Sequence, residues 1–308
     1  MGLKVTLFGF CLVSSLALAA PASNSFIPSM ITPAPTPLPQ NAWSRVAYPS
    51  RGMTDSIGFY YQGCIGGAQA LPLDGDGYQV MHPSRNRYYA NPELIQYVQD
   101  LAITVEAMGS GLLVGDLGQP RGGPMPYGHA SHQIGLDVDI WYWTHPEQSI
   151  RSLTLDERET SVMQSVLNEN GVVDPRKFGR EQILKLKMAS ENDVVQRIFV
   201  NPAIKVYLCS TLQDKDLSWL HKLRPWPGHD SHFHVRLHCP AEAKNCDGQA
   251  PIAEGNGCTE VLPPRGTLNL ENGQGSGDVH ESAHQELLEK FFKAQATLPA
   301  ACLKLLKL

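Results

Sequence analysis

Two short segments of this chain carry most of the side chains that could bind a metal ion. They are residues 128–141 (GHASHQIGLDVDIW) and residues 229–238 (HDSHFHVRLH). Together they hold six of the eleven histidines and three carboxylates. Imidazole nitrogen and carboxylate oxygen are ligands that suit Zn²⁺, and three such ligands with a water make a hydrolytic zinc site. The two segments therefore predict a metal centre.

Both segments also alternate polar and apolar residues, as a half-buried strand does. Side chains at every second position of a strand point to the same face. A solvated strand face is the ordinary structural explanation, but such faces usually carry Lys, Glu, Thr and Ser. One face is apolar in each segment: Ile134, Leu136, Val138 and Ile140 in the first, and Phe233, Val235 and Leu237 in the second. The opposite face carries the polar groups: Asp137 and Asp139 with Trp141 in the first, and His232, His234, Arg236 and His238 in the second.

The spacing of His232 and His234 indicates two different roles. Two residues apart on one strand, their rings lie roughly 7 Å from each other along the chain. That separation suits one metal ligand and one proton-transfer group beside the metal better than two ligands. The sequence has no helical H-E-x-x-H motif, so we expect the ligands to come from a loop and strands, with His132 at the start of the first strand.

These residues match a known family. The pattern Ser131-His132-x-x-Gly135-x-x-x-Asp139, followed by a distant His232-x-His234, resembles the LAS group of zinc metallopeptidases. Longer matches in residues 128–141, 197–205 and 224–240 are similar to the penicillin-insensitive murein endopeptidase family within that group. The resemblance runs from about Cys64 to Cys258. It implies an α+β fold with a mostly antiparallel central sheet and flanking helices, like that of the hedgehog and D-Ala-D-Ala peptidase proteins.

The resemblance also implies roles for individual residues. His132, Asp139 and His234 correspond to the ligands of a Zn²⁺ cofactor, and His129 is placed near the metal as well. His232 corresponds to the histidine that acts as a base or stabilises the charge of the transition state.

Three further residues are expected around this set. His229 corresponds to a histidine that lines the site, Asp137 could hydrogen-bond a ligand imidazole, and Ser131 positions the loop. For His129 and His229 an alternative stays open, namely that they lie behind the ligands or line the substrate groove without contacting the metal. For Asp137 an ordinary strand carboxylate is the alternative.

The activity implied by the resemblance is hydrolysis of D-alanyl-meso-diaminopimelyl cross-links in peptidoglycan, without a serine nucleophile and therefore insensitive to β-lactams. Two alternatives stay open. One is a D,D-carboxypeptidase or dipeptidase of the same fold. The other is a catalytically inactive, zinc-containing protein that binds peptidoglycan.

The N-terminus predicts export to the periplasm. Residues 1–19 have the features of a signal peptide: Lys4, an apolar stretch at 5–18 that is too short to span a bilayer well, and Ala17-Leu18-Ala19. A membrane anchor is the alternative. Residues 20–42 form a Pro-rich lead-in, and 43–308 are expected to be one metallopeptidase domain with a disulfide-tied C-terminal extension. We expect no membrane span in the mature chain, and a monomer or a dimer. The net charge of −5 argues against nucleic-acid binding.

The cysteine count fits an oxidising compartment. Removal of the signal peptide takes Cys11 and leaves six cysteines, and an even number in an exported chain implies disulfides. The count alone allows fifteen connectivities. The family resemblance implies three particular pairs: Cys64 with Cys302, Cys209 with Cys258, and Cys239 with Cys246.

Local patterns predict the remaining elements. Asn91 and Pro92 mark the start of a helix, because Asn caps a helix well and Pro suits its first position. Further helices are expected at 154–170, 180–190, 202–208 and 216–223, the last capped by Asp216, and a terminal amphipathic helix at 285–293. Strands are expected at 112–117 and 197–201.

Overall fold

The computed structural model describes residues 2, 39–148, 151–213, 217–261 and 298–307. The predicted signal peptide apart from residue 2, most of the lead-in, the predicted cap Asp216 and the predicted helix 285–293 lie outside the described residues. All the elements given below belong to the unit Pro39–Leu308.

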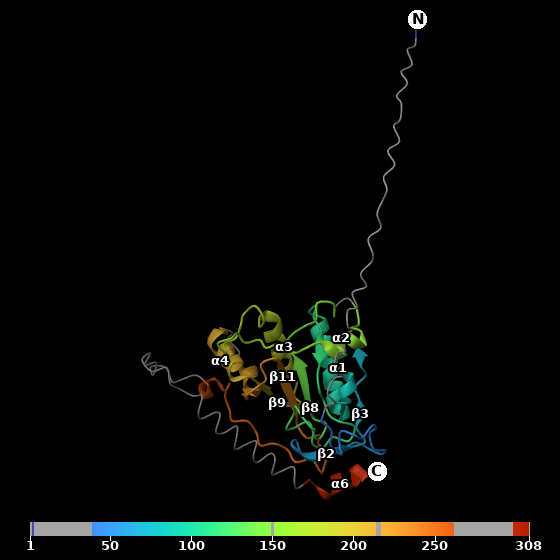
Figure 1. Ribbon diagram of the computed structural model, residues 1–308. Coiled ribbons are helices and arrows are strands. Elements are labelled where there is room, and N and C mark those ends of the chain that lie inside the picture. Colours follow the sequence, from blue (N-terminus) through green and yellow to red (C-terminus); the bar gives the residue numbers. More distant parts are fainter. Residues whose placement is uncertain (1, 3–38, 149–150, 214–216, 262–297, 308) are drawn as a thin grey trace, which may run out of the picture. The chain divides into compact units, whose positions relative to one another are not determined.

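A seven-stranded sheet forms the centre of this unit, in the order β10-β9-β11-β8-β7-β5-β4 (Figure 1). The pairs β11–β8, β11–β9, β7–β8 and β4–β5 are antiparallel, whereas β10–β9 and β5–β7 are parallel. The predicted α+β class with a mostly antiparallel sheet is therefore confirmed. In sheet order the strands are Leu223–Pro225 (β10), Val195–Val200 (β9), His232–Leu237 (β11), Asp137–Trp141 (β8), Leu112–Val114 (β7), Tyr78–Val80 (β5) and Asp74–Gly75 (β4).

Helices and two small sheets complete the unit. The hairpin β1–β2 spans Asp55–Phe59 and Gln62–Gly66, and β3 (Gln69–Ala70) pairs with β6 (Tyr89–Ala90). The α-helices are Pro92–Glu106 (α1), Leu155–Thr160 (α2), Arg180–Glu191 (α3), Pro202–Thr211 (α4) and Ala300–Lys307 (α6). Short 3₁₀ helices cover Pro83–Arg85, Ser218–Lys222 and Cys258–Glu260. Among the described residues, no helix has the length and apolar character needed to cross a membrane.

Helix α1 begins at the cap that the sequence predicts, and α4 begins in the same way at Asn201, which was expected to end a strand. The side chain of Asn91 accepts a hydrogen bond from the backbone of Glu93 at the start of α1, and Asn201 does the same for Ala203 in α4. Each cap is followed by a proline, whose missing N–H costs nothing in the first turn.

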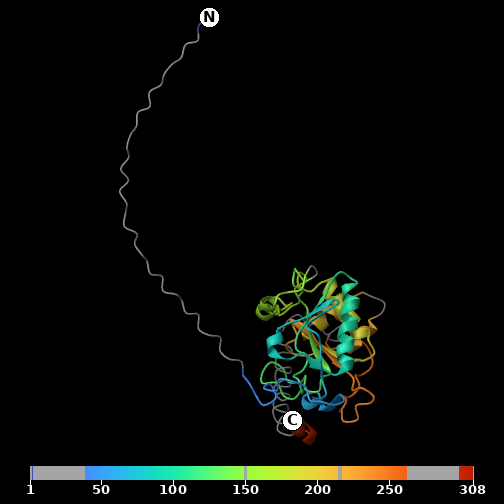
Figure 2. The ribbon, with the colours of Figure 1, turned by 90° about the vertical axis from the view of Figure 1, so that its right-hand side faces the viewer.

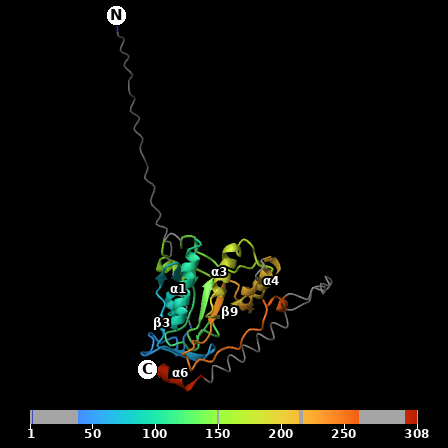
Figure 3. The ribbon, with the colours of Figure 1, turned by 180° about the vertical axis from the view of Figure 1, so that it is seen from behind.

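Helices α1, α3 and α4 pack on the apolar face of the sheet. Figures 1 and 3 show α1 and α3 running along the sheet, with α4 on the β9 side, and Figure 2 shows α1 beside the sheet after a quarter turn. Val138 and Ile140 of β8 and Val235 of β11 share one buried core with Leu94 of α1 and Leu186 of α3. The polar side chains of β8 and β11 must therefore lie on the other face, because neighbouring side chains of a strand alternate.

Several expected elements are shorter than their patterns indicated. The predicted helix 154–170 ends at Thr160, and the backbone N–H of Val166 donates instead to the carbonyl of Asp230. This tertiary hydrogen bond and the burial of Val166 outweigh a weak helix propensity. The predicted strand 112–117 ends at Val114, and the expected helix 216–223 is a 3₁₀ helix at Ser218–Lys222.

The strand of the first histidine segment also starts later than expected. His132 was predicted at its start, but β8 begins at Asp137. With a φ of 65°, His132 has a left-handed backbone, which does not fit an extended strand. His238, expected on the polar face of the second strand, lies beyond the end of β11 and is exposed.

Three disulfides tie the unit together, and they are the three pairs that the resemblance implied. Cys64 of β2 is bonded to Cys302 of α6. Cys239 and Cys246 close a small loop after β11. The third joins Cys209 to Cys258.

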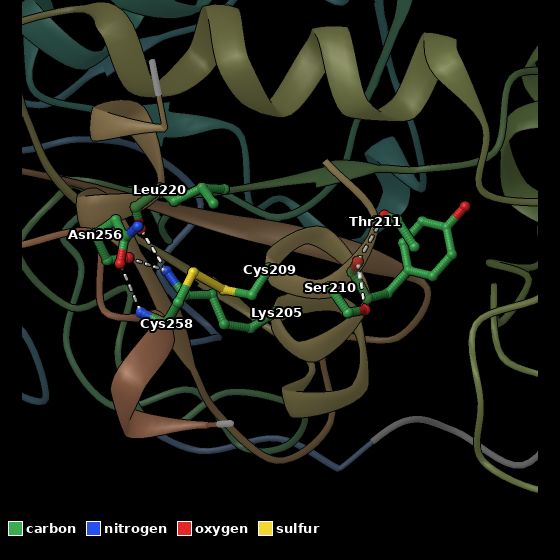
Figure 4. The surroundings of a disulfide bond; sticks show 8 residues. Lys205, Cys209, Ser210, Thr211, Leu220, Asn256 and Cys258 are labelled. Carbon is green, nitrogen blue, oxygen red and sulfur yellow. Dashed lines mark hydrogen bonds between the residues drawn. A yellow bond between two sulfur atoms is a disulfide. The ribbon is translucent and has the colours of Figure 1, made fainter. Parts of the chain in front are cut away.

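The surroundings of the Cys209–Cys258 bond are drawn in Figure 4. Lys205, fully buried one turn before Cys209 in α4, donates from Nζ to the carbonyls of Leu220 and Asn256 at 2.6 and 2.7 Å. These contacts and the disulfide hold the segment around Cys258 against α4.

Candidate metal centre

The pairing of β8 with β11 brings the two histidine segments together. In the antiparallel register His234 lies opposite Asp139, and Arg236 lies opposite Asp137. Directly opposite residues have their Cβ atoms roughly 5 Å apart and share one face. The strand register therefore places imidazole, guanidinium and carboxylate groups in contact on the face away from the core.

Three atoms converge at the centre of this cluster. His132 Nε2 lies 3.2 Å from His234 Nδ1 and 3.4 Å from Asp139 Oδ1, and the latter two atoms are 3.3 Å apart. All three side chains are almost fully buried. Among the described residues nothing donates a hydrogen bond to Asp139 Oδ1. A buried carboxylate oxygen without a donor is costly, and a bound cation would satisfy it.

The partners of the two histidines turn their free nitrogens toward this centre. His132 Nδ1 lies 2.6 Å from the carbonyl of Leu117, which can only accept, so Nδ1 carries the proton and Nε2 keeps its lone pair. His234 Nε2 lies 3.1 Å from Asp137 Oδ1, without the alignment of a hydrogen bond, and this nearby carboxylate favours a proton on Nε2 and a lone pair on Nδ1. Two lone pairs and a carboxylate oxygen facing one another repel unless a cation lies between them.

Asp137 holds several parts of the cluster at once. It accepts hydrogen bonds from Nε and Nη2 of Arg236 at 2.8 and 3.1 Å and from the backbone N–H of His132 at 3.0 Å. Arg236 in turn lies over the ring of Tyr60, with Cζ 4.1 Å from its centroid. The buried guanidinium lowers the free energy of the buried carboxylate, which keeps Asp137 ionised.

Asp139 contacts two more histidines through its other oxygen. Oδ2 lies 3.4 Å from His129 Nδ1 and 3.6 Å from His232 Nε2. His129, His132 and Asp139 also form a group that could hold a metal ion, with ligand atoms within 4.8 Å of one another. The ring of His229 packs against that of His232 at 5.2 Å. All the histidines that the sequence singled out as site residues therefore meet here.

Ser131 lies in the loop of the first histidine segment. It is partly buried and precedes His132 in the loop that leads to β8.

Two of the site histidines have an unfavourable backbone. His132 and His229 have φ values of 65° and 53°, in the left-handed region that glycine favours. In each segment the residue before the first histidine, Gly128 or Gly228, is also left-handed. Such strain costs on the order of 1–3 kcal/mol per residue and is found mostly where the surroundings fix it at functional sites.

The pKa values within the cluster separate its acids from its bases. Burial lowers the pKa of His229 to about 3, with help from His234 and His232. Burial also lowers the pKa of His232, against the opposing charge of Asp139. Burial would raise the pKa of Asp139, but His232, His132 and His129 hold it well below its usual range. The site thus presents an ionised carboxylate beside two histidines, His229 and His232, whose pKa values lie below their ordinary value. The neighbouring carboxylates raise the pKa of the other two, His129 and His234, despite their burial.

One residue of this cluster, Asp116, was missed by the sequence reasoning. It lies just after β7, is buried, and has its Oδ2 atom 2.9 Å from His129 Nε2 and 2.8 Å from Arg87 Nη1. The only signal was a carboxylate at the end of the predicted strand 112–117, which no motif connects with the histidines. Its role follows from contacts between distant segments.

The site is a cluster of histidines and an aspartate that could hold a metal ion, and it lies on antiparallel strands of an α+β unit. A further histidine lies beside it. These features define the class of metal-dependent hydrolases. The family model that describes the penicillin-insensitive murein endopeptidases matches residues 56–307. The chain belongs to this family, which confirms the resemblance inferred from its sequence.

Curated relatives agree with this assignment. A penicillin-insensitive murein endopeptidase of Haemophilus influenzae is 46% identical over 224 residues, which cover 71% of this chain and 77% of that protein. Proteins of the same name from Klebsiella pneumoniae and Pectobacterium atrosepticum are 42% and 41% identical over 227 and 228 residues. These matches cover 71% of this chain in both cases, and 79% and 77% of the relatives.

Proposed function

We propose that this protein is a zinc-dependent endopeptidase that hydrolyses peptide cross-links in peptidoglycan, at the bond between D-alanine and meso-diaminopimelate. The single observation that carries the proposal is the buried triangle of His132 Nε2, Asp139 Oδ1 and His234 Nδ1. The names of the relatives support the substrate class.

The dimensions of this triangle support zinc. Ligand atoms bound to a tetrahedral zinc ion at about 2.0–2.1 Å lie about 3.3–3.4 Å from one another. The three observed separations are 3.2, 3.3 and 3.4 Å. We therefore assign the ligands to His132, Asp139 and His234, with a fourth position open to water and substrate. His129 Nδ1 adjoins the same carboxylate and completes the histidine shell.

The reaction divides between the cofactor and the chain's own groups. A zinc ion bound here supplies a Lewis acid, which polarises the scissile carbonyl and lowers the pKa of water toward ~7. His232, neutral and with Nε2 directed toward the Asp139 carboxylate, accepts the proton of the attacking water and can return it to the departing amine. Asp137 keeps His234 in the orientation that presents Nδ1.

This division of roles needs no serine nucleophile. Ser131 lies in the loop before His132 and not in the turn of a Gly-x-Ser-x-Gly motif. Without an acyl-enzyme step, β-lactams have no serine to acylate. We therefore expect activity in the presence of penicillin.

We also propose that the protein acts in the periplasm. Its three disulfides persist only under oxidising conditions, and its proposed substrate lies outside the cytoplasmic membrane.

The test is mass spectrometry of muropeptides after incubation with the zinc-loaded protein. Cross-linked dimers should be converted to monomers with and without penicillin, and a chelator should stop the reaction. Removal of single D-alanine residues from monomeric pentapeptides, with dimers left intact, would instead identify a D,D-carboxypeptidase. Zinc bound at one ion per chain without turnover of either substrate would identify a protein that only binds peptidoglycan.

A further inference from the structure

We propose that Asp116 is a positioning residue of the metal site, which together with Arg87 fixes which ring nitrogen of His129 faces Asp139. The inference rests on the proposed function in that it assumes a metal-dependent site. It concerns a residue outside both histidine segments, and it follows from the contacts of Asp116 alone.

Asp116 binds His129 in a buried ionic network. Its Oδ2 atom lies 2.9 Å from His129 Nε2, 2.8 Å from Arg87 Nη1 and 3.5 Å from Arg85 Nη1. The side chains of Asp116 and Arg87 are each 3% exposed, so both charges depend on each other for compensation. A carboxylate so placed is ionised and accepts hydrogen bonds only.

This contact determines the tautomer of His129. Because Asp116 accepts from Nε2, that nitrogen carries a proton, and Nδ1 is the nitrogen that faces Asp139 Oδ2, at 3.4 Å. With a cation bound at the cluster, Nδ1 is then the nitrogen that can present a lone pair. The arrangement matches that of His132, whose Nδ1 binds a carbonyl and whose Nε2 faces the centre. In both histidines, therefore, the ring nitrogen that points away from the centre donates to a hydrogen-bond acceptor.

The backbone of the same segment contacts two of the assigned ligands. The carbonyl of Asp116 accepts from the N–H of Asp139 at 3.0 Å, and the carbonyl of Leu117 accepts from His132 Nδ1 at 2.6 Å. Residues 116 and 117 thus contact three members of the cluster. A disturbance of the Asp116 side chain can reach the metal through His129 without changing these backbone bonds.

Arg87 also contacts the loop that carries His129. Its guanidinium lies over the ring of Tyr127, with Cζ 4.1 Å from the centroid, and Nη2 donates to the Tyr127 carbonyl at 3.2 Å. Tyr127 is two residues before His129 in the chain. Arg87 therefore orients Asp116 and the start of the histidine loop together.

The informative substitution is Asp116→Asn. Arg87 can only donate, so it takes the amide oxygen, and the amide NH₂ is left facing His129 Nε2. His129 must then keep its proton on Nδ1, where an N–H points toward Asp139 in place of a lone pair. This change alters the contact that His129 makes with Asp139, one of the assigned ligands. Loss of such a partner of a ligand typically reduces metal affinity about 10- to 100-fold.

A double-substitution cycle tests whether Asp116 acts through His129. Zinc affinity is measured by competition with a chelating dye for the wild type, Asp116→Asn, His129→Ala and the double variant. We expect Asp116→Asn to weaken zinc binding by about 10- to 100-fold in the wild type and by less than about twofold in the His129→Ala background. Equal losses in both backgrounds would overturn the proposal, because they would mean a general structural effect.

A control variant and a second measurement keep the test decisive. Asp74, on the edge strand β4, is the carboxylate partner of another buried arginine, Arg158. The control Asp74→Asn removes this partner and should leave zinc affinity unchanged. If Asp116→Asn does not fold, nitrogen-15 NMR of the zinc-loaded wild type reads the His129 tautomer directly. A proton on Nε2 supports the proposal, and a proton on Nδ1 refutes it.

The turnover of cross-linked dimers adds an independent readout. Asp116→Asn should lower kcat with little change in KM, and Asp116→Glu, which keeps the charge, should restore part of the loss. Because zinc affinity is measured without substrate, the cycle decides the role of Asp116 even if the wild type proves not to cleave dimers.

Discussion

His232 and His234 share one face of β11, yet we expect their substitution by alanine to have different consequences. His234 Nδ1 lies within 3.3 Å of both other ligand atoms of the proposed zinc site. His232 Nε2 approaches only Asp139 Oδ2, at 3.6 Å. We therefore expect His234 to act as a metal ligand and His232 to act as a proton-transfer group.

The two substitutions differ in which property is lost, metal affinity or catalytic rate, and in the size of the loss. A zinc site with four ligands binds with about 10–16 kcal/mol, so one ligand accounts for roughly 3–4 kcal/mol, or about 10²–10³-fold in affinity. His234→Ala also leaves the Asp137 and Asp139 carboxylates without one of their buried contacts. A proton-transfer group contributes typically about 10²–10⁴-fold to the rate and nothing to metal binding. His232→Ala should thus keep its zinc and lose turnover, whereas His234→Ala should lose both.

The assay combines two measurements on the same samples. Zinc content is determined by elemental mass spectrometry after dialysis against a fixed free-zinc concentration, and turnover is measured on purified cross-linked dimers. His238→Ala is the matched control, since this histidine belongs to the same sequence segment but is exposed beyond the end of β11. A metal-free His232→Ala protein, or a zinc-loaded one with full activity, would refute the division of roles.

Three other predictions follow from single features of the structure. Asp137→Asn should reduce zinc affinity by about 10- to 100-fold, measured by chelator competition, because the carboxylate beside His234 Nε2 is lost; unchanged affinity would contradict this. Replacing Cys64 and Cys302 together by alanine opens a loop with a sequence separation of 238 and should lower the free energy of unfolding by about 5 kcal/mol at most, measured in denaturant; a loss below about 1 kcal/mol would show that the bridge constrains little. The pKa of His229 is about 3 in the fold, below its ordinary value, so the unfolded chain binds more protons between pH ~6.5 and 3, and the stability of the metal-free protein should fall as the pH drops through that window. His229→Gln should lessen this acid-induced fall in melting temperature, and an unchanged pH dependence would count against the burial effect.

The sequence by itself determined the polar and apolar faces of the two central strands and the starts of two helices. Alternation in residues 137–141 and 232–237 was sufficient, because the side-chain period of a strand depends only on local backbone geometry. The caps at Asn91 and Asn201 are equally local, since each side chain bonds a backbone group two residues away. The disulfide pairs came only from the family resemblance, because six cysteines admit many pairings.

Only the tertiary structure decided how these pieces form a site. The register that sets His234 opposite Asp139 joins strands separated by almost a hundred residues, and local patterns carry no information about such pairing. The left-handed turn at His132 and the contact of Asp116 with His129 likewise depend on neighbours distant in sequence. The helix expected at 154–170 ends early for the same reason: a hydrogen bond from Val166 to the Asp230 carbonyl, together with burial, exceeds the few tenths of a kcal/mol per residue that helix propensity supplies.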